Sequence, residues 1–484
     1  MKKIIIDKED CTGCNACKAI CPKNAITMQF DKKGFRYPQI DGDKCIDCNL
    51  CVKVCGRRND YSHLRKSAHV LYSKDEALRK ISTSGGVFGE LAKYCIHLGG
   101  VVFGAAFDEN LKVYHCGVDN EPDLPLIQKS KYVQSDLKNT YEEAREILEG
   151  GRKVLFSGTP CQIAGFKAFL GEEYENLFCI DIICQGVPSP LVWEKYLEVL
   201  GDADAPISEV DFRSKINGWK ALNFSYKKGG NLVNTPFEND FYMKGFEDTE
   251  ILRDVCYNCS FRGEYGCADI TIGDCWGYKE IVGEEDDDFG ASVAIVNTDK
   301  GEKLLKELEG NFKLIKQIAP DTLRKYNKNL YYNPSFSGKR KAFFEMIEKG
   351  DYKNAFCILK SEPREKAYLP VVNKWLEYKM QGKNAVSDYL SEKGYKNIVI
   401  YGRGSLGEFV YKELTETGDV NVLFFIDNGV SAENTVSIKD ISPHALEKAD
   451  AVIITPIHVK AVIKNDLLKC YNGVIIGVDD ILLG

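Results

Sequence analysis

Short apolar runs alternate with stretches of helical spacing through the middle of the chain. The apolar runs predict strands and the helical spacing predicts helices: strands at Gly100–Phe107, Lys153–Ser157 and Leu177–Ile183, helices at Gly85–Leu98 and Gln162–Leu170. Apolar runs of this length are typical of strands that are buried on both faces between helices. The pattern therefore predicts an α/β or α+β domain over residues 63–345.

Polar segments interrupt and follow these runs. Leu222–Tyr226 and Asn231–Thr235 flank the sequence Lys-Lys-Gly-Gly, which predicts a β-hairpin. The acidic stretch Glu284–Asp288 is most simply a solvated loop. Residues 346–380 are charged and helical in their spacing, with an expected break at Pro370, and we interpret them as a connector.

A new pattern begins at about residue 381 and predicts a further folded unit over residues 381–484. Its helix is expected at Glu408–Leu414, directly after the first strand. Its strands are expected at Asn397–Tyr401, Val422–Ile426, Ala451–Ile454 and Val474–Val478. This alternation of strand and helix predicts a Rossmann-like parallel sheet.

A glycine motif joins the first of these strands to its helix. Gly402-x-Gly404-x-x-Gly407 opens the helix, and Asp427 ends the next strand 20 residues after Gly407. In this context the pattern is a dinucleotide fingerprint: the helix start faces a diphosphate and the carboxylate bonds a ribose hydroxyl. NAD(H) and a nucleotide sugar both suit it. The alternative is a module that binds nothing and serves as a surface for a partner.

Charge and composition narrow the class of protein. The net charge is −7 and the pI about 5.7, so the chain lacks the excess of basic residues that is typical of proteins that bind nucleic acid. The apolar stretch in Met1–Ile6 is too short for a signal peptide, and no run approaches the ~18 apolar residues of a membrane span. Nineteen cysteines in such a chain indicate a reducing compartment, and we expect a cytoplasmic protein.

Eight of the cysteines form two similar runs near the amino terminus. Each run has the spacing Cys-x-x-Cys-x-x-Cys-x-x-x-Cys, first over residues 11–21 and then over residues 45–55. In bacterial ferredoxins with this spacing, the fourth cysteine of each run ligates the other cluster. We therefore predict two [4Fe–4S] clusters with the ligand sets Cys11, Cys14, Cys17, Cys55 and Cys45, Cys48, Cys51, Cys21.

Two other interpretations of these cysteines compete with the clusters. Zinc uses four ligands in two paired knuckles, usually with longer gaps, and disulfides are the third possibility. We interpret residues 1–62 as a ferredoxin-like two-cluster domain, with strands at Lys2–Asp7 and Phe35–Ile40. Its one departure from the usual pattern is Gly56, where proline is common after the last cysteine.

Further motifs lie between these cysteines and the carboxyl-terminal unit. They are Ser82-Thr83-Ser84-Gly85-Gly86, Lys129–Ser135, Leu155–Ile163 with its Gly-Thr-Pro-Cys-Gln string, and Cys256-x-x-Cys259 followed by Cys267–Asp274. Over residues 63–345 these strings resemble the family of the coenzyme F-420 hydrogenase/dehydrogenase beta subunit. Asp181–Pro190 and Phe212–Lys215 are similar to a bacterial branch that often accompanies surface-polysaccharide genes.

The resemblance implies that this domain binds FAD. Ser84, Gly85 and Gly86 would hold the flavin diphosphate at a helix N-terminus, although an ordinary N-cap explains them too. Lys131 would neutralise phosphate or reduced flavin, or else is a solvated surface lysine. The turn that would approach the flat ring comprises Gly158, Thr159, Pro160, Cys161 and Gln162.

The resemblance also implies a [4Fe–4S] cluster within this domain, which would be the third of the chain. Its expected ligands are Cys256, Cys259 and Cys267, with Cys184 as the fourth. Cys161 is the chief rival for the fourth place, and it is alternatively a buried structural thiol. For Asp269 and Asp274 we expect structural roles in backbone bonding or capping.

Taken together, the leading hypothesis is an iron–sulfur flavoprotein oxidoreductase. Electrons would pass between ferredoxin, or a similar partner, and a small-molecule substrate, with a sugar or nucleotide sugar of polysaccharide biosynthesis preferred. The protein supplies position and electrostatics to such chemistry, and we name no catalytic acid or base. The alternatives are an electron-transfer subunit or adaptor for a partner enzyme, and a reductase of coenzyme F-420.

Overall fold

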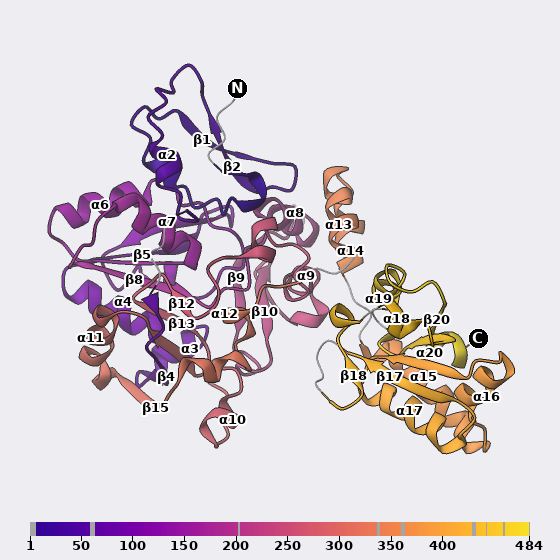
Figure 1. Ribbon diagram of the computed structural model, residues 1–484. Helices are drawn as coiled ribbons and strands as arrows, with labels where there is room; N and C mark the ends of the chain where they lie inside the picture. The colour runs from indigo at the N-terminus through magenta and orange to yellow at the C-terminus, as the bar shows by residue number, and fades with distance from the viewer. Residues whose placement is uncertain are drawn as a thin grey trace. The chain divides into compact units, whose positions relative to one another are not determined.

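The structure is a computed structural model that describes residues 6–58, 63–201, 204–335, 339–359, 364–427, 432–441, 443–457 and 460–483 (Figure 1). The chain divides into two compact units, Met1–Lys360 and Ser361–Gly484. The division falls inside the segment 346–380 that the sequence predicts as a connector. Within the described residues, no helix combines the length and the apolar character that crossing a membrane requires.

The first unit begins with the cysteine-rich segment. Strands β1 (Ile26–Phe30) and β2 (Arg36–Ile40) pair antiparallel, and the short helices α1 (Ala16–Ala19) and α2 (Leu50–Lys53) carry cysteines. The predicted strand Lys2–Asp7 falls largely outside the described residues. Phe35 is fully buried in an apolar core that it shares with residues from later in the chain, so this segment is anchored to the domain that follows.

An eight-stranded mixed sheet forms the centre of the first unit, in the order β15-β4-β14-β13-β8-β7-β5-β6. Its parallel part contains four neighbouring strands: β5 (Val101–Phe107), β7 (Val154–Gly158), β8 (Leu177–Ile182) and β13 (Ile270–Asp274). The flanking strands are antiparallel: β4 (Ser67–Ser73), β6 (Val113–Val118), β14 (Ser292–Val296) and β15 (Phe312–Ile318). Among the eight strands of the sheet, β5, β7 and β8 coincide with the apolar runs that the sequence predicts as strands.

Helices cover both faces of this sheet, which explains why its strands are apolar on both sides. On one face, Phe103 and Phe156 pack against α6 (Thr140–Glu149) and α7 (Pro160–Leu170). On the other face, Val102, Leu155 and Ile180 pack against α4 (Val87–His97) and α11 (Asp299–Glu307). Successive side chains of each strand point to opposite faces of the sheet. Helix α7, which carries Cys161, therefore packs on the face of Phe103 and Phe156.

A smaller three-stranded sheet stands beside the large one, in the order β11-β10-β9. The predicted hairpin is β10 (Asn223–Lys228) and β11 (Asn231–Pro236), and β9 (Ile207–Ser214) completes the sheet. Its core is aromatic and includes side chains from α8 (Pro190–Leu200), α9 (Phe241–Glu247), α13 (Lys339–Glu348) and α14 (Tyr352–Leu359).

Two local predictions need correction. The acidic stretch is a loop whose carboxylates form ion pairs: Asp287 with Arg79 at 2.6 Å and Asp286 with Lys220 at 2.9 Å. It is therefore bound to the domain rather than simply solvated. Pro370 does not break the chain into two helices, because it lies inside α15 (Arg364–Met380).

The second unit is a five-stranded sheet in the order β18-β17-β16-β19-β20, and all neighbouring strands run parallel. The strands are β16 (Asn397–Tyr401), β17 (Asn421–Ile426), β18 (Thr435–Val436), β19 (Ala451–Ile454) and β20 (Val474–Gly477). The chain passes from β16 to β17 on one side and later to β19 on the other, so the strand order reverses beside β16. A crevice for ligands is expected at such a switch point.

Glu413 on α17 (Ser405–Thr417) connects the helices of this second unit. Its buried carboxylate accepts hydrogen bonds from Trp375 Nε1 at 2.8 Å and from the backbone N–H of Val386 at 2.9 Å. It also pairs with Lys379 at 2.9 Å. These contacts join α17 to α15 and to the start of α16 (Ala385–Glu392).

We predict that Glu413→Ala destabilises the second unit by about 3 kcal/mol, because it leaves buried donors and a lysine without their acceptor. Hydrogen–deuterium exchange of the full chain should show faster exchange in peptides of residues 385–417. The control is Glu416→Ala on the same helix, where the carboxylate is exposed and the expected change is within about 0.5 kcal/mol. Equal exchange in the two variants would contradict this role.

Candidate functional site

The structure brings the eight amino-terminal cysteines together as two sets. Cys11, Cys14, Cys17 and Cys55 line one small cavity. A second cavity is lined by Cys21, Cys45, Cys48 and Cys51. These are the groupings that the ferredoxin spacing predicts, with the last cysteine of each run serving the other set. We call them the inner set and the outer set.

The two cysteine loops have the same backbone conformation. Asn15 and Asn49 both have φ of 62°, and each precedes a short helix, α1 or α2. Gly13 and Asp47, two residues earlier, are also left-handed, with φ of 72° and 54°. Asparagine, aspartate and glycine are the residues that adopt this region at lowest cost. The repeated turn places three thiols of each run around one cavity.

Burial governs the electrostatics of the inner set. It raises the pKa of Cys14 to about 11, and it also raises the pKa of Cys17, with repulsion from Cys14 and Cys11 as smaller causes. Cys14 and Cys17 are therefore protonated near neutral pH, and a metal that binds them must displace the protons. Among the described residues, no three His, Cys, Asp or Glu side chains converge on a position for a single metal ion.

Four further cysteines, which we call the third set, line a cavity of the central domain: Cys161, Cys184, Cys256 and Cys259. Cys161 is the second residue of α7, and Cys184 follows the end of β8. Burial raises the pKa of Cys184 to about 12, and the neighbouring Cys256 adds to the rise. Cys161 likewise has a raised pKa, because of burial first and then of Cys259, Cys184 and Cys256.

Cys267 does not join this set, which corrects the predicted ligands. It is buried in an apolar cluster with Cys179 and Ala268. The reason is the direction of the strands: β13 and β8 are parallel, Cys267 precedes β13, and Cys184 follows β8. The two cysteines therefore lie toward opposite ends of the sheet. Cys161, at the start of the helix that follows β7, lies at the same end as Cys184.

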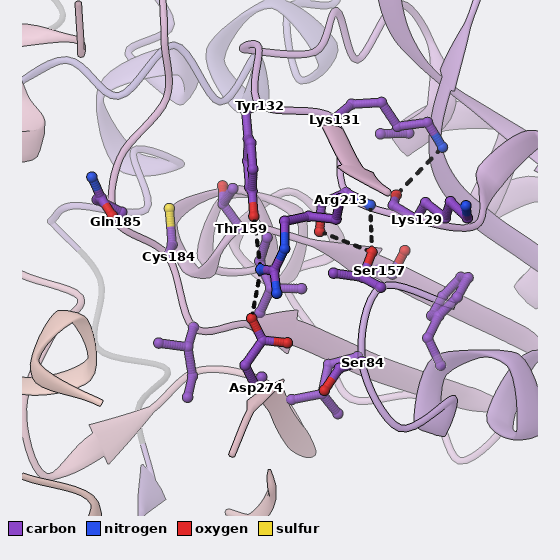
Figure 2. A pocket seen from close by; sticks show the side chains of 18 of the residues that line it. Ser84, Lys129, Lys131, Tyr132, Ser157, Thr159, Cys184, Gln185, Arg213 and Asp274 are labelled. Atoms are coloured by element: carbon purple, nitrogen blue, oxygen red, sulfur yellow. Dashed lines mark hydrogen bonds and ion pairs between the residues drawn. The ribbon is translucent and has the colours of Figure 1, made fainter. Parts of the chain in front are cut away.

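A large cavity of about 610 Å³ opens at the carboxyl ends of the parallel strands. Gly158 ends β7, Ile182 ends β8 and Asp274 ends β13, and all three line it. Ligands of α/β sheets bind at this edge, and the volume is in the range of cofactor pockets. Figure 2 shows side chains from these strand ends and from the loops at residues 129–132 and 184–185 around the space.

The predicted diphosphate loop reaches this cavity in part. Ser84 and Gly86 line it, and Gly86, with φ of 90°, precedes α4. Gly85 does not: its N–H donates to Ser292 Oγ at 2.9 Å, and a Cβ there would lie 2.9 Å from the carbonyl oxygen of Leu71. Gly85 therefore packs against the sheet and has no free N–H for phosphate, which corrects its predicted role.

The predicted ring-facing turn divides between two cavities. Gly158, Thr159 and Gln162 line the large cavity, whereas Pro160 and Cys161 line the cavity of the third set. Gln162 accepts a hydrogen bond from the Thr159 N–H at 2.9 Å in a capping box at the start of α7. The turn thus forms part of the wall between the two cavities.

Lys131 also lines the large cavity, but its ammonium group is held by its own loop. It donates to the carbonyl oxygens of Leu126 at 3.1 Å and Gln128 at 2.5 Å. Burial lowers the pKa of Lys131 to about 7. The side chain therefore carries a full positive charge near neutral pH only when an anion in the cavity stabilises it.

Arg213 and Asp274 form a buried ion pair at 2.7 Å on the cavity wall. Figure 2 shows Arg213 between Tyr132 and Asp274, with which it interacts. Burial lowers the pKa of Arg213, but Asp274 and Tyr132 outweigh it and the net pKa is raised. From the sequence alone, only a structural role is expected for Asp274. The pair is separated by 61 residues, so no local signal connects the partners.

One wall separates the large cavity from the third set. Ile182, Cys184 and Val187 line both cavities. Ile182 is 40% exposed even though it ends a central strand. Its apolar side chain is therefore available to an apolar group of a ligand in the large cavity. A flat cofactor on Ile182 would therefore contact the same side chains that surround the third set.

In the second unit, Gly402–Gly407 joins β16 to α17 as the sequence predicts. Gly402 has φ of 99°, and a Cβ on Gly407 would lie 2.0 Å from the carbonyl oxygen of Gly402. Gly404 has open space where a Cβ would be. Asp427 accepts a hydrogen bond from the Arg403 N–H at 2.7 Å, so the strand end and the glycine loop are in contact.

Comparison with known proteins agrees with the amino-terminal geometry. Residues 10–58 match a 4Fe-4S dicluster domain, which confirms the iron–sulfur prediction for this segment. Residues 151–319 match the family formed by the C terminus of the coenzyme F420 hydrogenase/dehydrogenase beta subunit. The chain is therefore an iron–sulfur electron-transfer protein of oxidoreductase type, related over its central region to that beta subunit.

Among solved structures, the F420-reducing [NiFe] hydrogenase complex from Methanosarcina barkeri, in a xenon derivative, is similar to the chain. The identity is 17% and the TM-score 0.39, over 59% of this chain and 94% of that chain. No curated protein matches the sequence.

We predict that Cys161→Ser lowers the iron content of anaerobically purified protein by about one third, because it would remove a thiolate from the cluster expected at the third set, beside the two at the amino terminus. Cys267→Ser is the matched control, since it also removes a buried thiol and should leave the iron content unchanged. Iron and sulfide analysis of both variants checks this. An iron loss confined to Cys267→Ser would restore the ligand set that the sequence predicts.

Proposed function

We propose that the protein is an iron–sulfur flavoprotein oxidoreductase, with three [4Fe–4S] clusters and FAD as cofactors. The observation that carries this proposal is the continuous series of cysteine sets that ends at the large cavity. The outer set, the inner set and the third set follow one another, and the third set shares a wall with the cavity.

Shared residues connect each site to the next. The inner set is close to the outer one, since Cys51 is among the groups that raise the pKa of Cys17. Thr12 lines the cavities of both the inner and the third set. Ile182 and Val187 line both the third cavity and the large one. Each cysteine set is therefore adjacent to the next one, and the third set is adjacent to the large cavity.

The bound cofactors would supply one-electron transfer at the clusters and two-electron exchange at the flavin. The residues of the chain position them and exclude water. Ile182 and Val187 offer an apolar surface for the ring. Ser84 and Gly86 lie where a diphosphate would meet the start of α4. Lys131, neutral in part near pH 7, gains its charge as an anion enters the cavity.

For the electron partner, we propose ferredoxin or a similar protein at the outer set, where Cys48 is exposed. For the substrate, the proposal is a small molecule, with a sugar or nucleotide sugar of polysaccharide biosynthesis preferred. The residues at the cavity also suit an electron-transfer subunit that serves a partner enzyme, or a reductase of coenzyme F-420. The glycine loop and Asp427 of the second unit support a site for NAD(H) or another nucleotide.

Anaerobic purification tests the proposal directly. The protein is expected to be brown, with iron and sulfide in equal amounts and about one FAD per chain. Reduced protein should then be assayed with NAD(P), deazaflavin and sugar nucleotides as acceptors. Reoxidation by a soluble acceptor supports the enzyme, and reoxidation only by a second protein supports the subunit. A colourless, zinc-loaded protein would refute both.

We further predict that Ile182→Glu lowers the flavin content about tenfold, because it places a carboxylate where the apolar ring would lie. Ile182 also lines the cavity of the third set, so iron analysis of the same preparation must show that the flavin loss is not secondary to loss of a cluster. Ile216→Glu is the control: Ile216 is 57% exposed and does not line the large cavity. Flavin retained at the wild-type level in Ile182→Glu would place the ring elsewhere.

A further inference from the structure

Arg253 is a fully buried arginine between the inner set and the third set. Its side chain is 0% exposed. Its Nε donates to the carbonyl oxygen of Cys11 at 2.7 Å, and Cys11 belongs to the inner set. The residue also lines the cavity of the third set. The same guanidinium therefore lies against both sites.

Within the described residues, all hydrogen-bond acceptors of this guanidinium are neutral. Besides the Cys11 carbonyl, they are Gln134 Oε1 at 3.1 Å and the carbonyl oxygen of Arg36 at 2.9 Å. The ring of Tyr37 lies 4.1 Å from the guanidinium carbon. Within the described part of the chain, no carboxylate forms an ion pair with Arg253. A buried charge without a counter-charge is costly, so the residue implies a missing anion.

Two carboxylates near Arg253, those of Asp254 and Asp136, have other partners. Asp254 pairs with Lys33 at 3.0 Å and with Arg340 at 2.5 Å. Asp136 pairs with Arg36 at 2.7 Å. These groups are occupied, so they leave the charge of Arg253 to be balanced by whatever the cysteines hold.

Clusters bound at the cysteine sites would provide that anion. An iron–sulfur core held by four thiolates has a net negative charge, and it becomes more negative on reduction. A buried cation beside it stabilises the reduced form and so raises the reduction potential.

We infer that Arg253 is a positioning and tuning residue that raises the reduction potentials of the inner and third sites together, relative to the outer site. This inference rests on the proposed function. Electrons that enter at the exposed outer set would then move inward, toward the large cavity. Arg65 and Arg262 also line the third cavity and also bond to neutral groups, Arg65 to Thr271 and Asn297 and Arg262 to Gln185. Among the three, Arg253 is the one with a described hydrogen bond to the inner set.

The test is a potentiometric titration of anaerobic protein monitored by electron paramagnetic resonance. In Arg253→Gln, the reduced-to-oxidised ratio of the two inner sites at a fixed potential should fall about tenfold, which is about 59 mV for one electron. The outer site should not change. Arg253→Lys keeps the charge and should recover most of the shift.

A second variant neutralises the positive charge of Arg253 without removing the arginine. Gln134→Glu places a carboxylate where Gln134 Oε1 lies, 3.1 Å from the guanidinium, and should lower the same two potentials. This variant tests the inference even if Arg253→Gln fails to retain its iron. The control is Arg79→Gln, since Arg79 is buried, pairs with Asp287, and lines none of the three cysteine cavities. It should leave every potential unchanged.

The outcomes separate the two proposals. Iron–sulfur signals in the wild type, with potentials that move in neither Arg253→Gln nor Gln134→Glu, would overturn the role of Arg253 and leave the proposed function intact. The absence of iron–sulfur signals from the wild type would overturn the proposed function itself. A shift of equal size at the outer site would show a general effect of charge and would also overturn the inference.

Discussion

The close packing of the cysteine-rich segment against α7 is the contact on which the arrangement of the sites depends. A Cβ on Gly165 of α7 would lie 2.7 Å from the sulfur of Cys14, and a Cβ on Gly56 would lie 2.9 Å from the Gly165 nitrogen. Neither position has room for a larger side chain. Because α7 also carries Cys161 near its start, this contact brings the inner set next to the third set.

The packing also accounts for Gly56, where the ferredoxin pattern usually has proline. Here Gly56 lies against the backbone of Ala164 and Gly165. Arg57 adds a bond across the same interface, since it donates to the carbonyl oxygen of Asn258 at 3.2 Å, and its ion pair with Asp10 at 2.7 Å lies within the cysteine-rich segment. The departure from the pattern is a consequence of the interface.

The features that could be predicted from the sequence are those encoded by local spacing. The two cysteine runs, the apolar strands β5, β7 and β8 and the parallel order of the second unit all follow from short patterns. The predicted position of Cys267 is wrong because spacing to Cys259 says nothing about which end of a strand a residue occupies. The predicted role of Gly85 is wrong because its N–H bonds to Ser292, which is 207 residues away.

Charge placement is the least predictable part of the site. Arg253 and Cys11 are 242 residues apart, and Arg213 and Asp274 are 61 residues apart, so neither relation leaves a trace in the local pattern. Arg213 has a carboxylate partner that is part of the protein, and its charge is balanced before any ligand binds. Arg253 has only neutral acceptors. The two buried arginines therefore differ in what they require: Arg213 has its counter-charge within the protein, whereas Arg253 would gain one only from a cluster bound by the neighbouring thiols.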